Sequence, residues 1–380
     1  MNAQFDVLIV GGGPAGCACA LAMHNKGYRV ALIDKASFPR DKVCGDAIPG
    51  QSFKAIHQLH PQWATALQQF TDQTPIHASR AIFGNNSFRY QWKLFASNSK
   101  RIDFDYFLHN LVRNETNTTL INNEQVASVN QSPEGIVCTL KSGGQLQAAL
   151  VIGCDGSNSI VKRSLLKKAD NKEDVYAAVR IYYSGITGVT PGENEFHYLK
   201  EVEGYFWIFP LPNQWCNVGF GILKNKQKQG APTDARKTLE TIINSAPFKQ
   251  RFQHAVPMSK LTGYSLPVWG KTQVLSGERC LLAGDAACLV DPLQGHGIDK
   301  AIRSGIMAAN QAVKSLKANR FDAAFMQQYD AHIHQTLGKE LQRNYQIRLY
   351  WSRFPGIIKW LTNLPLSQNF INLLLKKIKL

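Results

Sequence analysis

The chain has 380 residues, which is enough to bury a large core divided between two domains. Hydrophobic residues make up 44% of it and charged residues 18%, and no apolar run approaches the roughly 18–20 residues that span a membrane. The formal charge of +16 is compatible with an anionic partner, but no basic segment is interleaved with aromatic residues, so we expect no nucleic acid.

The amino terminus and the cysteines indicate the compartment. The start, "MNAQFDVLIVGGG", has no basic segment before its apolar run and does not resemble a signal peptide. No two of the eight cysteines are spaced C-x-x-C, so we expect neither an iron–sulfur cluster nor another metal site. We expect a reduced, cytoplasmic protein and a monomer.

The first predicted elements form a dinucleotide-binding unit. The sequence predicts a buried strand at Phe5–Val10, a helix over Pro14–Lys26 and a second strand at Arg29–Ile33. Asp34 ends the second strand, where its carboxylate can accept a hydrogen bond from a ribose hydroxyl. A negative charge there disfavours the 2′-phosphate of NADP and leaves NAD or FAD as the cofactor. Three glycines spaced G-x-G-x-x-G allow a tight turn, a close approach of the backbone to a pyrophosphate, and close packing of the helix on the sheet. They are Gly11, Gly13 and Gly16.

Two later stretches favour FAD. "VIGCDGSNSIVKRSLL" predicts a strand that ends at Asp155-Gly156 before a helix begins, and a strand at Cys280–Ala283 runs into Gly284-Asp285. A carboxylate at such a strand end can bind the ribityl hydroxyls of a flavin. A long helix beginning near Gly297 would direct its positive end at the flavin. Each piece alone could be a glycine turn with an aspartate N-cap, but three in this order predict a flavoprotein.

Residues 76–97 and 175–268 are predicted to form a second sheet. Its segment "YFWIFP" (205–210) is apolar on both faces, so it either lies in a core or lines a cavity for a hydrophobic ligand. Alternation places Phe206 and Ile208 on one face and Tyr205, Trp207 and Phe209 on the other.

The predicted fold class is therefore α/β: a Rossmann-like FAD-binding domain with an inserted β-sheet substrate domain and a C-terminal helical tail. The FAD-binding domain is discontinuous and comprises residues 1–75, 98–170 and 269–330. The substrate-binding domain comprises 76–97 and 171–268, and the helical region 331–380.

The carboxyl-terminal segment is basic and amphipathic. From residue 331 onward there are eight Lys or Arg residues and one acid, and a helix from about Ser367 would gather Phe370, Ile371 and Leu374 on one face. This face either packs on the FAD-binding domain or rests on an anionic membrane. The second alternative predicts peripheral membrane contact that salt reverses.

The order of the three glycine and aspartate motifs resembles the flavoprotein superfamily of para-hydroxybenzoate hydroxylase. Within it, "FPRDKVCGDAIP", "RIDFDYFLHNL", "YFWIFP" and "DPLQGHGIDKAIRSG" resemble the geranylgeranyl reductase family, FAD enzymes that saturate isoprenoid double bonds. That family has a Tyr-x-Trp-x-Phe-Pro motif followed by Gly-x-Gly. Here Tyr205, Trp207, Phe209 and Pro210 are followed by Gly219 and Gly221.

The resemblance implies roles for particular residues. Arg101 and Asp285 would hold the phosphates and the ribityl chain, and Cys44 would lie near the flavin. Gln294 and His296 depart from relatives, which commonly have a small residue and an acid there. The substrate would contact Tyr205, Trp207, Phe209 and Pro210. The implied FAD-binding residues are Gly11, Gly13, Pro14, Ala15, Gly16, Asp34, Lys35, Arg40, Cys44, Gly45, Arg101, Val126, Asp155, Gly156, Gly284, Asp285, Pro292, Gly295, His296, Gly297 and Ile298.

The expected reaction is hydride transfer from flavin N5 to a double bond of an isoprenoid or related lipid, which also requires a proton. Cys44, His296 and solvent are the candidate proton donors. No second dinucleotide motif identifies the electron donor. The first alternative is a flavin monooxygenase or halogenase; a halogenase needs a lysine near the flavin, and Lys54 and Lys93 are not marked by any motif. The second is a lipid or flavin carrier without chemistry.

Overall fold

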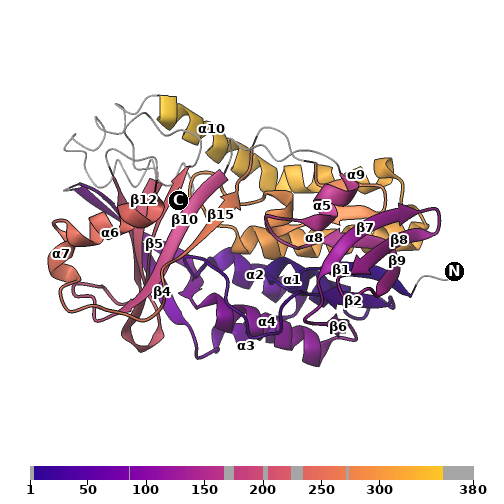
Figure 1. The fold of residues 1–380 in the computed structure, drawn as a ribbon, viewed down its shortest axis with the longest axis horizontal. Coiled ribbons are helices and arrows are strands. Elements are labelled where there is room, and N and C mark those ends of the chain that lie inside the picture. The colour runs from indigo at the N-terminus through magenta and orange to yellow at the C-terminus, as the bar shows by residue number, and fades with distance from the viewer. Residues whose placement is uncertain are drawn as a thin grey trace.

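The computed structural model describes residues 4–84, 86–166, 175–199, 204–223, 234–270 and 274–353. Two β-sheets lie at opposite ends of an elongated molecule, with helices α1 to α4 below and α8 to α10 above in this view (Figure 1). The predicted α/β fold class, including a helix near the carboxyl end, is confirmed. The amphipathic helix expected from Ser367 lies outside the described residues.

The first sheet has the strand order β16-β17-β9-β1-β2-β6, and β8 joins β7 to β9. Strands β17, β9, β1, β2 and β6 run parallel. Parallel strands covered on both faces carry continuous apolar runs, as in FDVLIV. The strands are β1 Phe5–Val10, β2 Val30–Ile33, β6 Thr119–Ile121, β7 Val126–Ser132, β8 Gly135–Leu140, β9 Gln145–Gly153, β16 Ser276–Gly277 and β17 Cys280–Leu282.

The second sheet has the order β14-β10-β13-β12-β11-β4-β5-β3, with β15 beside β10. All its pairs are antiparallel except β11 with β4. Its strands are β3 Ala47–Ile48, β4 Thr74–Phe83, β5 Asn86–Asn98, β10 Val175–Ser184, β11 Glu193–Tyr198, β12 Gly204–Pro210, β13 Trp215–Leu223, β14 Val256–Pro257 and β15 Thr262–Pro267.

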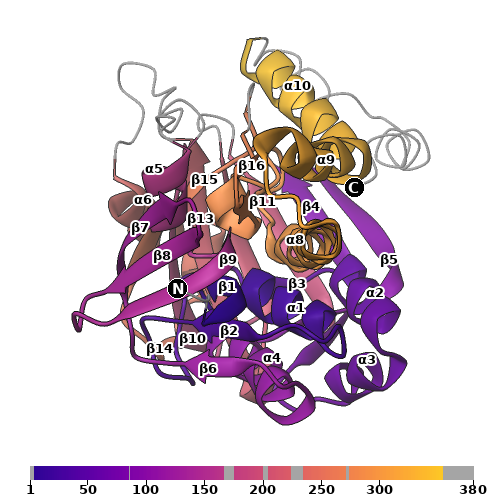
Figure 2. The same ribbon diagram turned by 90° about the vertical axis from the view of Figure 1, so that its right-hand side faces the viewer.

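Ten α-helices are described, and α8, which is seen end-on in Figure 2, lies against α1. They are α1 Pro14–Met23, α2 Gly50–Leu59, α3 Pro61–Gln68, α4 Arg101–Glu115, α5 Ile160–Leu165, α6 Ala235–Asn244, α7 Phe248–Arg251, α8 Ile298–Ala318, α9 Ala323–Ile333 and α10 Lys339–Arg353. Among the residues described, no helix combines the length and the apolar character needed to cross a bilayer.

Helix α1 ends three residues earlier than predicted. The prediction placed its end at Lys26, whereas the helix stops at Met23 and His24 is extended (ψ 137°). Asn25 then takes a left-handed conformation (φ 57°), which asparagine tolerates better than most residues, and Gly27 another (φ 79°). The helix therefore ends at Met23, and both Asn25 and Gly27 lie beyond its end.

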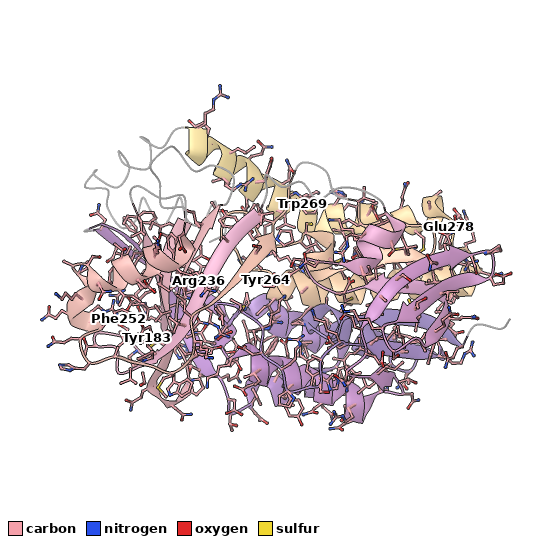
Figure 3. The ribbon with its side chains drawn as sticks, viewed as in Figure 1. Tyr183, Arg236, Phe252, Tyr264, Trp269 and Glu278 are labelled. Atoms are coloured by element: carbon pink, nitrogen blue, oxygen red, sulfur yellow. The ribbon has the colours of Figure 1, made fainter. Side chains whose placement is uncertain are left out.

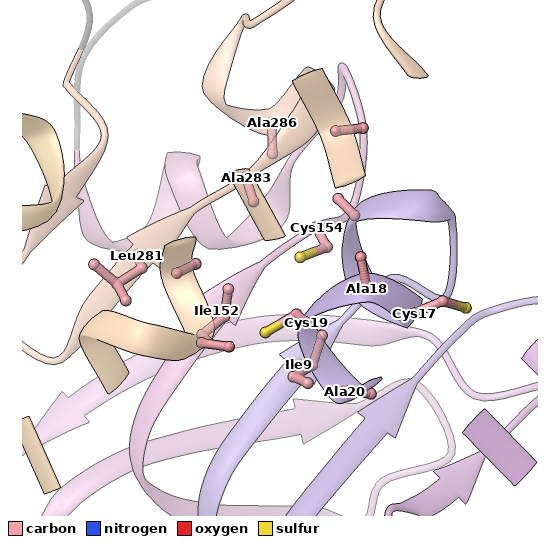
Figure 4. Close-up of a cluster of buried hydrophobic side chains, with 14 of the residues drawn as sticks. Ile9, Cys17, Ala18, Cys19, Ala20, Ile152, Cys154, Leu281, Ala283 and Ala286 are labelled. Atoms are coloured by element: carbon pink, nitrogen blue, oxygen red, sulfur yellow. The ribbon is translucent and has the colours of Figure 1, made fainter. Parts of the chain in front are cut away.

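Small side chains bring α1 close to the first sheet. Cys19 of α1 lies next to Ile9 and Ile152 of the sheet, and Ala18 and Ala20 belong to the same fully buried cluster (Figure 4). The small volumes permit close packing without voids. This contact fixes the position of the amino end of α1 relative to the strand ends.

Candidate active site

The three glycine motifs meet at the carboxyl ends of β1, β9 and β17. An ideal Cβ added to Gly11, which has φ +104°, would lie 2.3 Å from the carbonyl oxygen of Cys154. A Cβ on Gly284 would lie 3.2 Å from that of Ala15. Ligands of open parallel sheets bind at this edge. The motifs at 11–16, 153–156 and 283–285 thus form one site.

The amino end of α1 has free N–H groups that could bind an anion. Its N-cap is Gly13 and its first residue Pro14, and among the described residues no side chain caps its free N–H groups. Asp34 is buried at the end of β2, where Oδ2 accepts from the N–H of Gly12 (2.6 Å) and Oδ1 from that of Ala36 (2.8 Å). A phosphate at Gly13 and a ribose at Asp34 would lie on adjacent strand ends, as the sequence predicts.

Three cationic side chains surround this helix start. Asp105 of α4 binds Arg101 through two bonds (2.6 and 2.7 Å) and Arg40 through one (2.8 Å). The Arg40 guanidinium lies 3.5 Å from the position of a Cβ on Gly13. Lys42 contacts Asp285 at 2.7 Å. The residues present therefore fit a dinucleotide diphosphate, because the uncapped N–H groups of α1 and the Arg40 guanidinium lie at the same place.

Asp285 connects the phosphate region to the start of α8. Burial opposes its ionisation, but Lys42 and Arg101 outweigh burial and hold the pKa of this carboxyl below its ordinary value. A Cβ on Gly297, the N-cap of α8, would lie 3.7 Å from its Oδ1. Asp285 is therefore an ionised acceptor between two helix starts.

We expect Asp285→Ala to lose most of its FAD during purification. A hydrogen bond to a charged group contributes about 1.5–3 kcal/mol, so the affinity should fall roughly 10- to 100-fold. The measurement is flavin absorbance per protein. Asp6→Ala, which breaks the comparable Asp6–Arg29 pair (2.9 Å) away from the site, is the control and should remain yellow. Full flavin occupancy in Asp285→Ala would remove this residue from the cofactor site.

The second motif supports a helix as well as the site. Oδ2 of Asp155 accepts from the N–H of Ile160 (2.7 Å) at the start of α5, while its buried Oδ1 has no partner among the described residues. Gly156 lies next to Tyr264 of β15, whose hydroxyl bonds Ser157 Oγ (2.6 Å). Figure 3 shows Tyr264 between the two ends of the molecule. The motif therefore also joins the two sheets.

The other residues expected around FAD lie at various depths. Lys35 is exposed directly after Asp34, whereas Val126 is buried at the first position of β7. The carbonyl of Pro292 accepts from Tyr176 (2.8 Å), and that of Pro210 from Asn98 (2.8 Å). The buried residues Ala15, Gly16 and Ile298 lie in α1 and α8. The contacts of these residues with FAD stay predictions.

The alternation predicted for "YFWIFP" separates two environments. Phe206 and Ile208 belong to the core beneath α6 and α7, with Leu239 and Phe248. Trp207 and Phe209 are buried but lie outside both hydrophobic clusters of the described residues. With Tyr205 they form what we call the aromatic wall; ring centroids along it are 5.7 and 6.1 Å apart.

Two loops that carry proposed flavin contacts lie against the aromatic wall. An ideal Cβ on Gly45 would lie 3.2 Å from the Phe209 ring. The Tyr205 hydroxyl donates to the carbonyl of Gln294 (2.6 Å), in the loop 291–297 before α8. Gly219 is required behind the wall, because a Cβ there would lie 2.1 Å from Trp207 Cζ2. The wall is thus next to the proposed flavin site.

The two candidate proton donors differ in their surroundings. Burial raises the pKa of the Cys44 thiol even though Arg101 is nearby. His296 Nε2 contacts Lys300 Nζ at 2.8 Å. A protonated lysine can only donate, so Nε2 accepts and the ring proton sits on Nδ1. Burial therefore makes the Cys44 thiol a weaker acid, and Lys300 holds the His296 ring in place.

Lys300 occupies the centre of a buried ionic cluster. Burial opposes its charged form, but Asp299 (3.1 Å) and Glu340 (3.2 Å) outweigh burial and raise its pKa. Asp291, His296 and Glu340 have metal-binding atoms within 4.8 Å of one another. Lys300 already contacts two of these three residues, and backbone N–H groups together with Asn344 satisfy Asp291. The arrangement is that of an ion-pair network, not of an open metal centre.

Sequence reasoning missed several residues of this site. Lys42 and Asp105 hold its charged groups, and Asp46, Tyr182 and Asn217 lie beside Cys44. One signal was available: an acid within the apolar stretch "VCGDAI" directly after the Cys-Gly pair.

A Rossmann-like sheet, an uncapped helix start beside Arg40 and an aromatic wall are the features expected of a flavin-dependent oxidoreductase. The FAD binding domain family matches residues 4–339, so the chain belongs to this family and its cofactor is FAD. Its relatives confirm the resemblance found in the sequence, and the chain is an FAD-dependent oxidoreductase of geranylgeranyl reductase type.

Two relatives illustrate this similarity. The digeranylgeranylglycerophospholipid reductase of Methanocella arvoryzae is 26% identical over 358 residues, covering 92% of this chain and 87% of that protein. The menaquinone reductase of Mycobacterium tuberculosis is 29% identical over 319 residues, covering 80% and 75%.

Solved structures share the fold. A geranylgeranyl bacteriochlorophyll reductase-like protein from Thermoplasma acidophilum has a TM-score of 0.81 at 20% identity. The match covers 100% of this chain and 92% of that chain. A mutant of the halogenase PltM in complex with FAD has a TM-score of 0.75 at 18% identity, covering 89% and 75%. These identities support a common fold and do not distinguish the reactions.

Proposed function

We propose that this protein reduces carbon–carbon double bonds in the prenyl chain of a lipid. The observation that carries the proposal is the aromatic wall, because its rings face away from the core of their own sheet and towards the two loops of the proposed flavin site. Aromatic surfaces with few polar groups suit an isoprenoid chain. Both relatives described above are named as reductases, one of them of a prenylated phospholipid.

The residues have separate tasks in this proposal. FAD, when bound and reduced, supplies the two electrons as a hydride. Gly13, Asp34, Arg101 and Asp285 would orient the cofactor. Tyr205, Trp207 and Phe209 would hold the chain and exclude water, as alkene reduction requires. The division into FAD-binding and substrate-binding domains at residues 76–97 and 171–268 is part of the same proposal.

We further propose that the protein works as a cytoplasmic monomer that meets its lipid at a membrane surface. The basic carboxyl-terminal segment supports that contact, because each basic residue near an anionic surface contributes about 1 kcal/mol. A separate protein or nucleotide must supply the electrons, since this chain carries one dinucleotide motif.

A monooxygenase or halogenase remains the second candidate because halogenases share the fold. The two lysines considered for halogenation do not favour it. Lys54 on α2 and Lys93 on β5 are both exposed and lie outside the groups described around the aromatic wall. Flavin halogenases have a Trp-x-Trp-x-Ile-Pro motif, and this chain has Tyr205 and Phe209 in place of its first Trp and its Ile.

The test is an anaerobic mixing experiment. Holoenzyme reduced chemically should be reoxidised by a lipid with an unsaturated prenyl chain, and mass spectrometry should find a product heavier by two hydrogens. A lipid with a saturated chain is the control and should leave the flavin reduced. If the lipid does not reoxidise the flavin without oxygen, and a parallel reaction in air gives a hydroxylated or halogenated product, the second candidate is favoured.

A further inference from the structure

Asp46 lies in the loop that contacts the aromatic wall. It is fully buried, at 0% exposure, and has a left-handed backbone (φ 66°), a conformation that aspartate and asparagine adopt more readily than other side chains. Its neighbour Gly45 lies beside the Phe209 ring and Trp207 Nε1, at 3.2 and 3.7 Å from an ideal Cβ. The carboxyl group is thus held next to the wall and outside both hydrophobic clusters of the described residues.

The two carboxyl oxygens of Asp46 have unequal surroundings. Oδ2 accepts from the Tyr182 hydroxyl (2.8 Å) and from Asn217 Nδ2 (2.8 Å). Oδ1 is buried and has no partner among the described residues. A buried polar atom without a partner costs free energy, so this oxygen is free to bind a water or a ligand, or to carry a proton.

The same hydrogen bonds connect Asp46 to Trp207 and Cys44. Asn217 accepts from Trp207 Nε1 (2.9 Å) through its Oδ1, and its Nδ2 also donates to the carbonyl of Cys44 (2.7 Å). Asn217 is therefore fixed by three partners in addition to the sheet. It presents the Asp46 carboxyl in one orientation relative to the aromatic wall.

The charges around Asp46 do not fully compensate its burial. The titratable and charged groups near it are Arg180, Tyr182, Arg101 and Cys44. Burial raises the pKa of Asp46 to about 6, against the opposing effects of Arg180, Asn217 and Tyr182. A carboxyl group of this kind exchanges its proton near neutral pH, as an efficient general acid should.

We propose that Asp46 is the acid of this site and that its Oδ1 carries the proton which the second carbon of the double bond receives; this rests on the function proposed above. The O–H bond at Oδ1 breaks, a C–H bond forms, and the carboxylate regains a proton from solvent before the next turnover. The two electrons come from reduced flavin, which is a hydride donor.

Two measurements on oxidised holoenzyme, infrared spectra and thermal stability, test without turnover whether Asp46 binds and releases a proton. Difference infrared spectra between about pH 5 and about pH 8 should show a carboxyl band that Asp46→Asn lacks. The folded pKa exceeds the unfolded one, so wild-type stability decreases as pH rises through about 6. Asp46→Asn lacks this loss. The Tm of the variant minus the Tm of wild type should therefore be larger at about pH 8 than at about pH 5. Asp41→Asn, from the same loop but with a half-exposed side chain, should retain the band.

Rates test the delivery of the proton. Reoxidation of reduced holoenzyme by an unsaturated prenyl lipid should fall at least about 100-fold in Asp46→Asn at about pH 6, with FAD content unchanged. In wild type this rate should decrease above about pH 6. Tyr182→Phe removes a donor to the carboxylate, so it should raise the pKa of Asp46 and move the decrease to higher pH. A purely structural role would not move the profile in this direction.

Three outcomes would overturn the proposal. They are an infrared titration that is the same in Asp46→Asn, a variant rate equal to wild type, and a loss of FAD in Asp46→Asn that accounts for the lower rate. If wild type reduces no prenyl lipid, the proposed function falls with it. Normal wild-type turnover together with an unaffected Asp46→Asn variant overturns this inference alone.

Discussion

Gly11→Ala is expected to yield protein that neither binds FAD nor remains stably folded. The added Cβ would lie 2.3 Å from the Cys154 oxygen and 2.9 Å from the Asp155 Cα, and both are backbone atoms of the adjacent strand end. The backbone of Gly11 also has φ +104°, which strains any other residue. We expect the free energy of unfolding to fall by about 3 kcal/mol or more, measured by denaturant unfolding of the apoprotein.

Gly13→Ala is the matched control for this substitution. The nearest atom to its added Cβ is Arg40 Nη2 at 3.5 Å, an ordinary contact, so apoprotein stability should change by less than about 1 kcal/mol. FAD affinity should nevertheless fall, because the methyl group occupies the approach of the phosphate. Equal destabilisation by both substitutions would contradict the site described here, and unchanged FAD affinity in Gly13→Ala would place the diphosphate elsewhere.

Trp207→Ala is expected to reduce kcat/KM for a prenyl lipid while FAD content stays the same. Truncating a buried aromatic side chain that contacts a ligand costs roughly 2–4 kcal/mol, which corresponds to about 30- to 1,000-fold. Trp207→Phe keeps a ring but loses the bond to Asn217 (2.9 Å), so an intermediate loss would separate the contact of the ring from its hydrogen bond.

Phe206→Leu supplies the control from the other face of the same strand. Phe206 is fully buried beneath α6 and α7, so this change should lower stability by about 1–2 kcal/mol and leave turnover unchanged. If Trp207→Ala instead abolishes folding, or leaves lipid turnover intact, the aromatic wall is part of the core and the proposed function loses its main support.

Local periodicity and turn chemistry were sufficient to predict much of the fold. Continuous apolar residues at Phe5–Val10 belong to a parallel strand buried on both faces, and the structure places β1 there. The alternation in "YFWIFP" separated Phe206 from Trp207 correctly. These predictions succeeded because the period of a strand depends on neighbouring residues only.

The chemistry of the site depends on residues that are distant in sequence. Lys42 meets Asp285 across 243 positions, and Asp46 meets Asn217 across 171. No local sequence pattern predicts such pairs of distant residues. Whether a carboxyl group is buried, and which charges surround it, follows from packing that spans both sheets. The family resemblance therefore implied a role for Cys44 in its loop and gave none to Asp46.

The sequence by itself determined the class of this protein: the FAD-binding motif, the family to which it is similar and the strand that carries the aromatic residues. Tertiary structure alone decided which loops lie against that strand, that Lys300 contacts the His296 ring, and which acid lies beside the wall. The physical reason is that motifs report backbone geometry within a few residues, whereas protonation and binding depend on burial and on charges brought together by the whole fold.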